Sequence, residues 1–126
     1  MKVSELAERA GTTAKTIRFY ETEGVLPPAP RRGNGYREYS DVDVCRTRVV
    51  VGLRSLGLDL PESGRLAQLC ASGRCDEMAG DLAPRVAARR ADVAAAIAEL
   101  QHLDAELASV ERSLAAGVVQ VTRCCD

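Results

Sequence analysis

The stretch VSELAERAGTTAKTIRFYETEGVL, residues 3–26, decides the fold of this 126-residue chain. Its apolar residues follow a helical spacing from Val3 to Ala10 and stop at Gly11. Ser4 can cap this helix. A glycine directly after a helix indicates a tight turn, because glycine readily adopts the left-handed backbone conformation that closes a helix. The stretch therefore begins with a short helix and a turn.

A second short helix is expected after this turn. Thr12 or Thr13 can cap it, and it extends from Ala14 to about Glu23, where Gly24 ends it. Two short helices joined by a tight turn form a helix-turn-helix, whose second helix has the dimensions to enter the major groove of DNA. Because this spacing alone is a weak signal, the residues that follow matter more.

Residues 29–39, APRRGNGYREY, are expected to form a short hairpin beside these helices. Asn34-Gly35 is a typical hairpin turn. The arginines that flank this turn are Arg31, Arg32 and Arg37. A hairpin that carries arginines next to a helix-turn-helix is a wing, and its arginines can reach phosphates or the narrow minor groove. Alternatively, Arg31 and Arg32 belong to a merely solvated loop.

Two helices are predicted after the wing. Ser40 caps the first, which runs from Asp41 to about Leu56. Its inner face is expected to hold Val42, Cys45, Val49 and Leu53, with Cys45 as a small buried apolar residue. The second starts at Pro61 and ends near Leu69, and residues 70–76 form a loop.

A long helix is predicted over residues 82–114. It contains no internal glycine, and its apolar residues repeat at intervals of seven: Val86, Val93, Leu100, Leu107 and Leu114. This repeat is typical of a coiled coil. At a rise of about 1.5 Å per residue the helix is roughly 50 Å long, too long for the small front domain to cover. The exposed apolar stripe therefore predicts a homodimer.

The composition agrees with a mainly helical protein. Hydrophobic residues make up 46% of the chain and aromatic residues only 3%, so its core must be aliphatic. The net charge of −1 hides an uneven distribution. Residues 1–54 contain ten Lys and Arg and seven Asp and Glu, a net charge of +3, which leaves −4 for residues 55–126. A basic front half and an acidic rear half suggest different partners for the two.

The cysteines indicate a reducing compartment. Their number, five, is odd, which argues against a closed disulfide framework. The N-terminus has no apolar signal segment, and no stretch approaches the roughly 20 apolar residues that span a bilayer. We therefore expect a cytoplasmic protein that contacts no membrane. Reduced cysteines in that setting are more often metal ligands or nucleophiles than disulfide partners.

These segments resemble the MerR family of bacterial transcription regulators. The resemblance covers about residues 1–70, including the wing RRGNGYREYS. It is most specific at T-I-R-F-Y-E, residues 16–21, followed by Gly24, Leu26 and Pro27. It implies a mainly α fold, with a winged helix-turn-helix domain over residues 1–70 and a linker over residues 71–81. A dimerisation helix over residues 82–116 and a metal-binding tail over residues 117–126 follow. The two dimerisation helices would form an antiparallel coiled coil in the homodimer.

The resemblance also implies the residues that bind promoter DNA. Those on or beside the recognition helix and on the wing are Thr13, Lys15, Arg18, Tyr20, Arg31, Tyr36 and Arg37. Arg18 and Arg37 are expected to contact phosphates rather than bases. Family members typically bind an over-long promoter spacer and distort it when their effector binds, so that RNA polymerase can use both promoter elements.

The implied effector is a soft metal ion. Metal sensors of the family use a cysteine at the start of the dimerisation helix together with tail cysteines of the other protomer, which implies Cys75 with Cys124 and Cys125, and Cys70 as a possible fourth ligand. The tail departs from the usual pattern, because residues 111–122 contain no cysteine. Three thiolates with two adjacent tail cysteines favour Hg(II), with Zn(II), Cd(II), Pb(II) and As(III) as alternatives.

Two other classes of function compete with this one. A thiol redox sensor would oxidise Cys124 with Cys125, or Cys70 with Cys75. A thiol enzyme is disfavoured, because the one histidine, His102, lies on a helix with no nucleophile placed beside it. We therefore expect a regulator and not an enzyme.

Overall fold

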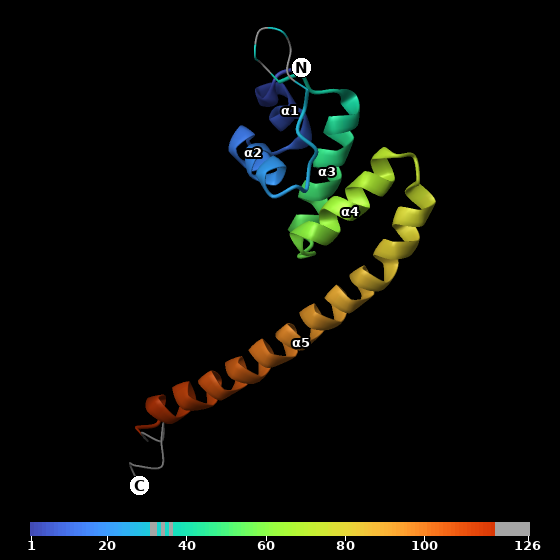
Figure 1. Cartoon of the computed structure of the whole chain (residues 1–126). Coiled ribbons are helices and arrows are strands. Elements are labelled where there is room, and N and C mark those ends of the chain that lie inside the picture. Colours follow the sequence, from blue (N-terminus) through green and yellow to red (C-terminus); the bar gives the residue numbers. More distant parts are fainter. Residues whose placement is uncertain (31–32, 34, 36, 118–126) are drawn as a thin grey trace. The chain divides into compact units, whose positions relative to one another are not determined.

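The computed structural model describes residues 1–30, 33, 35 and 37–117. These ranges contain five helices and no strand, which confirms the mainly α fold (Figure 1). The helices are α1 Val3–Ala10, α2 Ala14–Thr22, α3 Asp41–Ser55, α4 Leu60–Ala71 and α5 Cys75–Ala115.

Helices α1 and α2 form the predicted helix-turn-helix. Helix α1 ends at Gly11, whose φ of 73° is in the left-handed region that favours glycine. The Thr13 hydroxyl caps α2 by accepting a hydrogen bond from the Thr16 backbone N–H at 3.2 Å, as expected. The predicted cap at Ser4 is wrong, because Lys2 occupies the N-cap position and Ser4 already lies within the first turn of α1.

Helix α3 begins as predicted and buries Leu53 as predicted, but its buried face only partly matches the prediction. Asp43 accepts a hydrogen bond from the Ser40 backbone N–H at 2.8 Å and fixes the start of the helix. The side chain of Val42 is 45% exposed, so its assignment to the inner face is wrong. The buried residues of this helix are Val44, Thr47, Val50 and Leu53. Thr47 satisfies its hydroxyl by donating to the Asp43 carbonyl at 2.7 Å, which allows a polar side chain in the core.

Residues 1–89 form one compact unit with an aliphatic core. Leu6, Ile17 and Val50 are among its most buried side chains and join α1, α2 and α3. A second cluster, which joins α3 and α4 to the start of α5, contains Leu53, Leu58, Leu66, Met78 and Leu82. The helix-turn-helix therefore packs on a support formed by α3 and α4.

Helix α5 begins seven residues before the predicted Leu82. Helix α4 extends through Ala71, and α5 already starts at Cys75, so the predicted loop over residues 70–76 shrinks to three residues. The early turns of α5 contact α4 through ion pairs of Arg65 with Asp81 at 2.9 Å and of Arg85 with Glu62 at 2.8 Å. These tertiary contacts, which the sequence pattern does not show, stabilise the additional turns.

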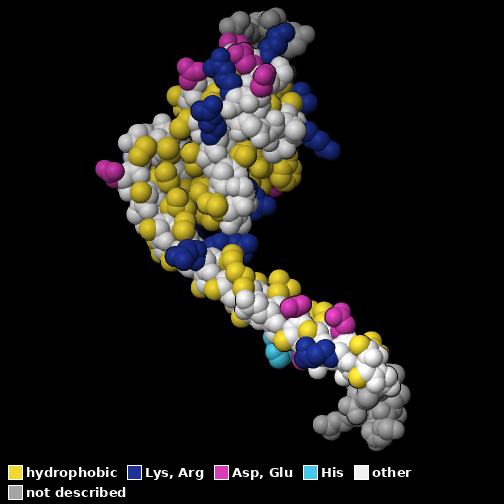
Figure 2. Space-filling model, turned by 180° about the vertical axis from the view of Figure 1, so that it is seen from behind, with side chains coloured by type: hydrophobic (Ala, Val, Ile, Leu, Met, Phe, Trp, Pro, Cys, Tyr) yellow, Lys and Arg dark blue, Asp and Glu magenta, His cyan; other side chains and the backbone are white. Residues whose placement is uncertain are grey.

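The second unit starts at Arg90 and is described as far as residue 117. It consists of the remaining turns of α5, and apolar side chains lie exposed along this helix (Figure 2). The large exposed apolar residues of α5 are Val86, Val93, Ile97, Leu100, Leu103, Leu107 and Leu114. No helix in the described part of the chain is long and apolar enough to cross a lipid bilayer.

Candidate nucleic-acid interface and metal-ligand cysteines

The exposed side of α2 is basic and polar. Thr13, Lys15 and Arg18 are exposed there, while Ile17 on the opposite side is fully buried and anchors the helix in the core. Within the described residues, neither Lys15 nor Arg18 has an acidic partner. Their positive charges are therefore available to a polyanion such as DNA.

Among the predicted DNA contacts that the structure describes, Tyr20 is the one that lies in the core. Its side chain is only 8% exposed and packs in the cluster with Leu6 and Ile17. The exposed ring of α2 is the neighbouring Phe19, at 51%. Because a buried ring cannot stack on or wedge against nucleic acid, we assign Tyr20 to the core and do not retain it in the interface.

Arg37 is held at the base of the wing by a buried carboxylate. Its guanidinium forms an ion pair with Glu21 of α2, whose side chain is 5% exposed. The Tyr39 hydroxyl donates a second hydrogen bond to Glu21 at 2.6 Å. Burial raises the pKa of Tyr39 above its usual value of 10.0, and the Arg37 charge opposes this rise, so the hydroxyl stays protonated and donates at neutral pH. This arrangement gives Arg37 a positioning role in addition to any contact with phosphate.

The two arms of the wing are joined close to this ion pair. The Glu38 backbone N–H donates a hydrogen bond to the Pro30 carbonyl at 2.9 Å. Arg31, Arg32, Tyr36 and the turn residue Asn34 lie outside the described residues, so their predicted part in DNA binding stays a prediction.

A shallow hollow of about 670 Å³ lies where α1, α2 and the wing meet. Its lining includes Lys2, Arg18, Glu21 and Arg37. Three of these four side chains are positively charged, and the one carboxylate is already engaged by Arg37 and Tyr39. The net positive charge of this surface suits a phosphate backbone.

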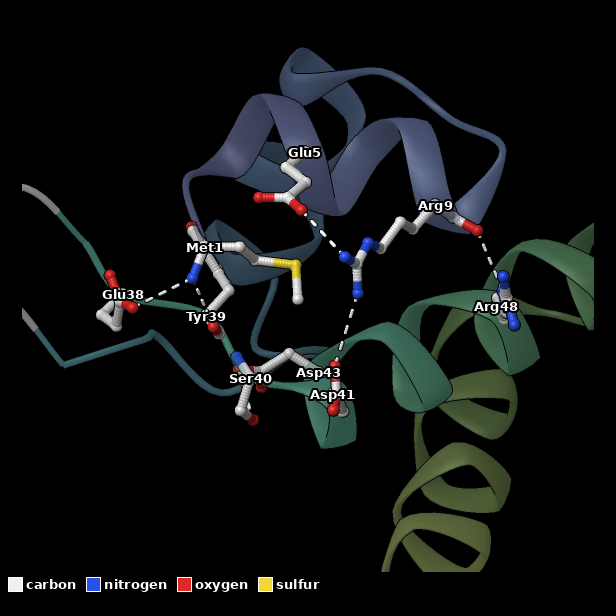
Figure 3. Close-up of polar contacts among 9 residues, drawn as sticks. All are labelled: Met1, Glu5, Arg9, Glu38, Tyr39, Ser40, Asp41, Asp43 and Arg48. Atoms are coloured by element: carbon white, nitrogen blue, oxygen red, sulfur yellow. Dashed lines mark hydrogen bonds and ion pairs between the residues drawn. The ribbon is translucent and has the colours of Figure 1, made fainter.

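A polar network connects α1 to α3 and fixes the support of this surface (Figure 3). Arg9 donates to Glu5 at 2.9 Å and pairs with Asp41 at 3.5 Å. Arg48 of α3 donates from Nε to the Arg9 carbonyl at 2.9 Å. The Met1 and Tyr39 backbones exchange two hydrogen bonds, both of 2.9 Å, which tie the segment just before α3 to the start of the chain.

Three cysteine side chains meet where α3, α4 and α5 come together. Cys70 Sγ lies 3.7 Å from Cys75 Sγ and 4.0 Å from Cys45 Sγ. Burial raises the pKa of the Cys70 thiol to about 11, and its hydrogen bonds with Cys75 and Cys45 add to the rise. Cys75 is exposed in the first turn of α5, whereas Cys45 and Cys70 are half-buried.

The described residues of one chain include two of the four predicted metal ligands, Cys70 and Cys75. Thiolates are the ligands that soft ions prefer, and Cys75 presents one at the surface next to Cys70. Within the described ranges, however, no group of three or more His, Cys, Asp or Glu side chains is arranged to hold a metal ion. The predicted ligands Cys124 and Cys125 lie outside these ranges. A site built on Cys75 therefore needs further ligands from outside the described part of one chain.

The sequence patterns do not predict two features of these sites, one at the cysteines and one at the wing base. Cys45 was assigned to the core alone, but its thiol contacts that of Cys70, which is 25 positions away along the chain. Glu21 was not singled out, although it joins α2 to the wing. A glutamate at the end of the specific run T-I-R-F-Y-E was the available signal.

Comparisons with known proteins place these observations in a family. Residues 1–69 match the MerR HTH family regulatory protein model. The chain is 32% identical over 113 residues to the HTH-type transcriptional regulator CueR of Salmonella typhi, an alignment that covers 90% of this chain and 80% of that protein.

Two solved structures are similar over most of the chain. The first is the transcription regulator PbrR691 from Ralstonia metallidurans CH34 in complex with lead(II), with a TM-score of 0.71 and 31% identity over 90% of this chain and 87% of that one. The second is HiNmlR, a MerR family regulator lacking the sensor domain, bound to promoter DNA. Its TM-score is 0.64, with 26% identity over 96% of this chain and 98% of that one.

The family match and the observed fold agree. The matched residues include the helix-turn-helix, the wing and α3, and the similarity to CueR continues into α5. The resemblance seen in the sequence is thereby confirmed, and the chain belongs to the MerR family of HTH regulatory proteins.

Proposed function

We propose that this protein is a metal-responsive transcription regulator that binds promoter DNA as a homodimer. One observation carries the proposal: in a MerR family chain, an exposed basic helix-turn-helix is joined through α3 and α4 to a long helix whose first residue is the exposed Cys75. The proteins compared above are described as regulators. The function we infer is therefore a cytoplasmic DNA-binding switch rather than catalysis.

DNA binding is assigned to the exposed side of α2 and to the wing. Lys15 and Arg18 supply charge that no described acid neutralises, and Thr13 lies at the N-terminus of the same helix. The pair formed by Arg37 and Glu21 holds the wing base against α2. The similarity to HiNmlR bound to promoter DNA supports this assignment.

Homodimer formation is assigned to α5. Its five apolar residues with a spacing of seven are all at least 36% exposed in the single chain, and Leu100 reaches 65%. A second copy of the same helix, packed antiparallel as the family resemblance implies, would cover this stripe and present two DNA-binding domains to a pseudo-palindromic promoter. RNA polymerase would then act on the promoter that the effector-bound dimer distorts.

The effector is proposed to be a soft metal ion held by thiolates. We assign Cys75 of one protomer with Cys124 and Cys125 of the partner subunit, and Cys70 as a possible fourth ligand because its thiol is 3.7 Å from that of Cys75. Three thiolates favour Hg(II), and Zn(II), Cd(II), Pb(II) and As(III) are the alternatives. The similarity to PbrR691 in complex with lead(II) supports a heavy thiophilic ion.

The test is a titration of the reduced full-length protein with Hg(II), Pb(II), Cd(II), Zn(II) and As(III), followed by thiolate-to-metal charge-transfer absorption. We expect saturation at one ion per site and loss of this absorption in Cys75→Ser, Cys124→Ser and Cys125→Ser. Cys45→Ser is the matched control, because it removes a thiol that the proposed site does not use.

Two outcomes would overturn parts of the proposal. Metal binding that survives Cys75→Ser would exclude the cross-protomer site. Saturation with metal that leaves both promoter binding and transcription in vitro unchanged would separate the metal from regulation.

A further inference from the structure

The thiol of Cys70 has two close neighbours, and metal binding through Cys75 does not explain both. Cys70 lies in the last turn of α4, Cys75 in the first turn of α5 and Cys45 in α3. The two sulfur separations, 3.7 Å and 4.0 Å, are the only ones between described cysteines short enough for thiol contact. The sequence places residues 70 and 75 near one another, but not their side chains against each other.

We propose that Cys70 and Cys75 are an oxidation site, which closes to an intramolecular disulfide when the protein meets a peroxide. The inference rests on the proposed function only for its consequence, because Cys75 is also the proposed metal ligand of α5. Closing the disulfide would withdraw this ligand, so that oxidation blocks the metal response.

The geometry favours this pair. A disulfide bond is about 2.05 Å long, so the two sulfur atoms must approach by less than about 2 Å. Only four residues separate the two cysteines, so bringing them together costs little chain entropy. Cys75 is exposed, and its side chain can change rotamer without displacing the core.

The pair of Cys45 with Cys70 is less suited to closure. Both side chains are half-buried, and they belong to helices that pack against each other along the core. Drawing these two sulfur atoms into bonding distance would move α3 relative to α4, where packing resists displacement. Cys75 is also the thiol that a dissolved oxidant reaches first, because it alone of the three is exposed.

The reaction balances with hydrogen peroxide as the oxidant. The Cys75 sulfur attacks one peroxide oxygen, the O–O bond breaks, one water leaves and a sulfenic acid remains. The Cys70 sulfur then attacks the Cys75 sulfur, the S–O bond breaks, the S–S bond forms and a second water leaves. Two thiols are thereby oxidised by two electrons, and one hydrogen peroxide is reduced to two waters.

Peptide mapping of the full-length protein tests the site. Reduced protein is treated with one equivalent of hydrogen peroxide, its remaining thiols are blocked, and it is cleaved with trypsin without reduction. Cleavage after Arg46, Arg65, Arg74, Arg85 and Arg123 places Cys45, Cys70 and Cys75 in three different peptides and the two tail cysteines in a fourth. We expect the peptide of residues 66–74 to be linked to that of residues 75–85, in protein that stays a covalent monomer on a non-reducing gel.

Matched variants decide which thiols react. Cys70→Ser should abolish the link, whereas Cys45→Ser should leave it in place. A link between residues 38–46 and 66–74, a bond from Cys75 to the tail, or covalent dimers in place of the internal link would each overturn the assignment. So would a Cys75 thiol that stays fully reactive toward the blocking reagent after peroxide.

A second measurement tests the consequence. Oxidised wild-type protein should lose its Hg(II) charge-transfer absorption and recover it with a thiol reductant. Cys45→Ser, which leaves both the proposed disulfide and the proposed metal site intact, should behave in the same way. Undiminished Hg(II) binding by the disulfide form would overturn the proposal that oxidation blocks the metal response. If reduced wild-type protein binds no metal, the proposed function fails, yet peptide mapping still decides whether the disulfide forms.

Discussion

Glu21 is a single residue that couples the recognition helix to the wing. Its carboxylate is almost fully buried and receives hydrogen bonds from both Arg37 and the Tyr39 hydroxyl. A buried charge is stable only when it is paired and hydrogen-bonded, and here both conditions hold. The wing base is consequently positioned by α2 itself, so a change at Glu21 or Tyr39 affects the wing without touching DNA.

Tyr39→Phe removes one of these two hydrogen bonds. We expect the free energy of unfolding to fall by about 1 kcal/mol at pH 7, measured by urea denaturation. Because the folded state raises the pKa of Tyr39, its contribution to stability is full below pH 10.0 and is lost as the pH rises through the folded-state pKa. The variant should therefore lose less stability above pH 10 than wild type does. An equal loss of stability above pH 10 in the variant and in the wild type would contradict this role of Tyr39.

The proposed contact of Arg18 with DNA is also a property of a single residue, and it depends on the positive charge of the side chain. Arg18→Ala should weaken promoter binding and reduce the slope of log K against log salt by about 1, because one phosphate contact is lost. Arg18→Lys should retain the slope. Fluorescence anisotropy with labelled promoter at several salt concentrations measures both. Arg74→Ala, which removes a charge paired with Glu77 away from α2, is the control, and an equal effect there would refute a specific role for Arg18.

At the scale of elements, α4 supports the helix-turn-helix by close approach to the segment after α2. Gly64 is buried, and a Cβ atom added there would lie 2.8 Å from Val25 Cγ1 and 3.2 Å from the Val25 carbonyl oxygen. The absence of a side chain at position 64 therefore sets the distance between α4 and this segment. The thiols of Cys45 and Cys70 meet between α3 and α4, the two helices that form this support.

Two glycine variants compare this contact with an open position. Gly64→Ala should destabilise the protein by about 1 to 3 kcal/mol, because the core must shift to admit the methyl group. Gly52→Ala, in an exposed part of α3 with no atom within 4 Å of the added Cβ, should instead stabilise it by about 0.5 to 1 kcal/mol. Thermal and urea denaturation of both variants provide the measurement. A neutral Gly64→Ala would show that Val25 moves aside freely.

At the scale of the whole molecule, the exposed stripe of α5 makes the proposed function depend on a second chain. Each protomer offers one recognition helix, so binding to two half-sites requires the dimer. Residues 1–54 carry a net charge of +3 and residues 55–126 carry −4, so the net charge of −1 hides the basic part of the chain.

Leu100→Lys tests this dependence. A charge in the stripe should shift the protein toward monomer at micromolar concentration and lower promoter affinity, as measured by analytical ultracentrifugation and anisotropy. His102→Lys adds the same charge at a position paired with Glu106 and 77% exposed, and should stay dimeric. Monomers in both variants, or in neither, would contradict the assigned stripe.

Within the described residues, the sequence by itself determined the helix-turn-helix, the turn at Gly11 and the apolar stripe of α5. These features depend on local interactions and local sequence patterns, such as the cap at Thr13, the glycine at position 11 and the repeat of seven. None of them requires tertiary contacts. It also determined the family, through the run of residues 16–21 and the wing.

Only the tertiary structure decided which side chains meet across elements. The burial of Tyr20, the choice of Val44 over Val42 on α3 and the early start of α5 follow from how helices pack, and several faces of α3 carry valine. The approach of Cys70 to Cys45 joins residues 25 positions apart, and the ion pair of Arg37 with Glu21 joins residues 16 apart. Such contacts depend on packing between helices rather than on periodicity along one helix, so no local pattern could reveal them.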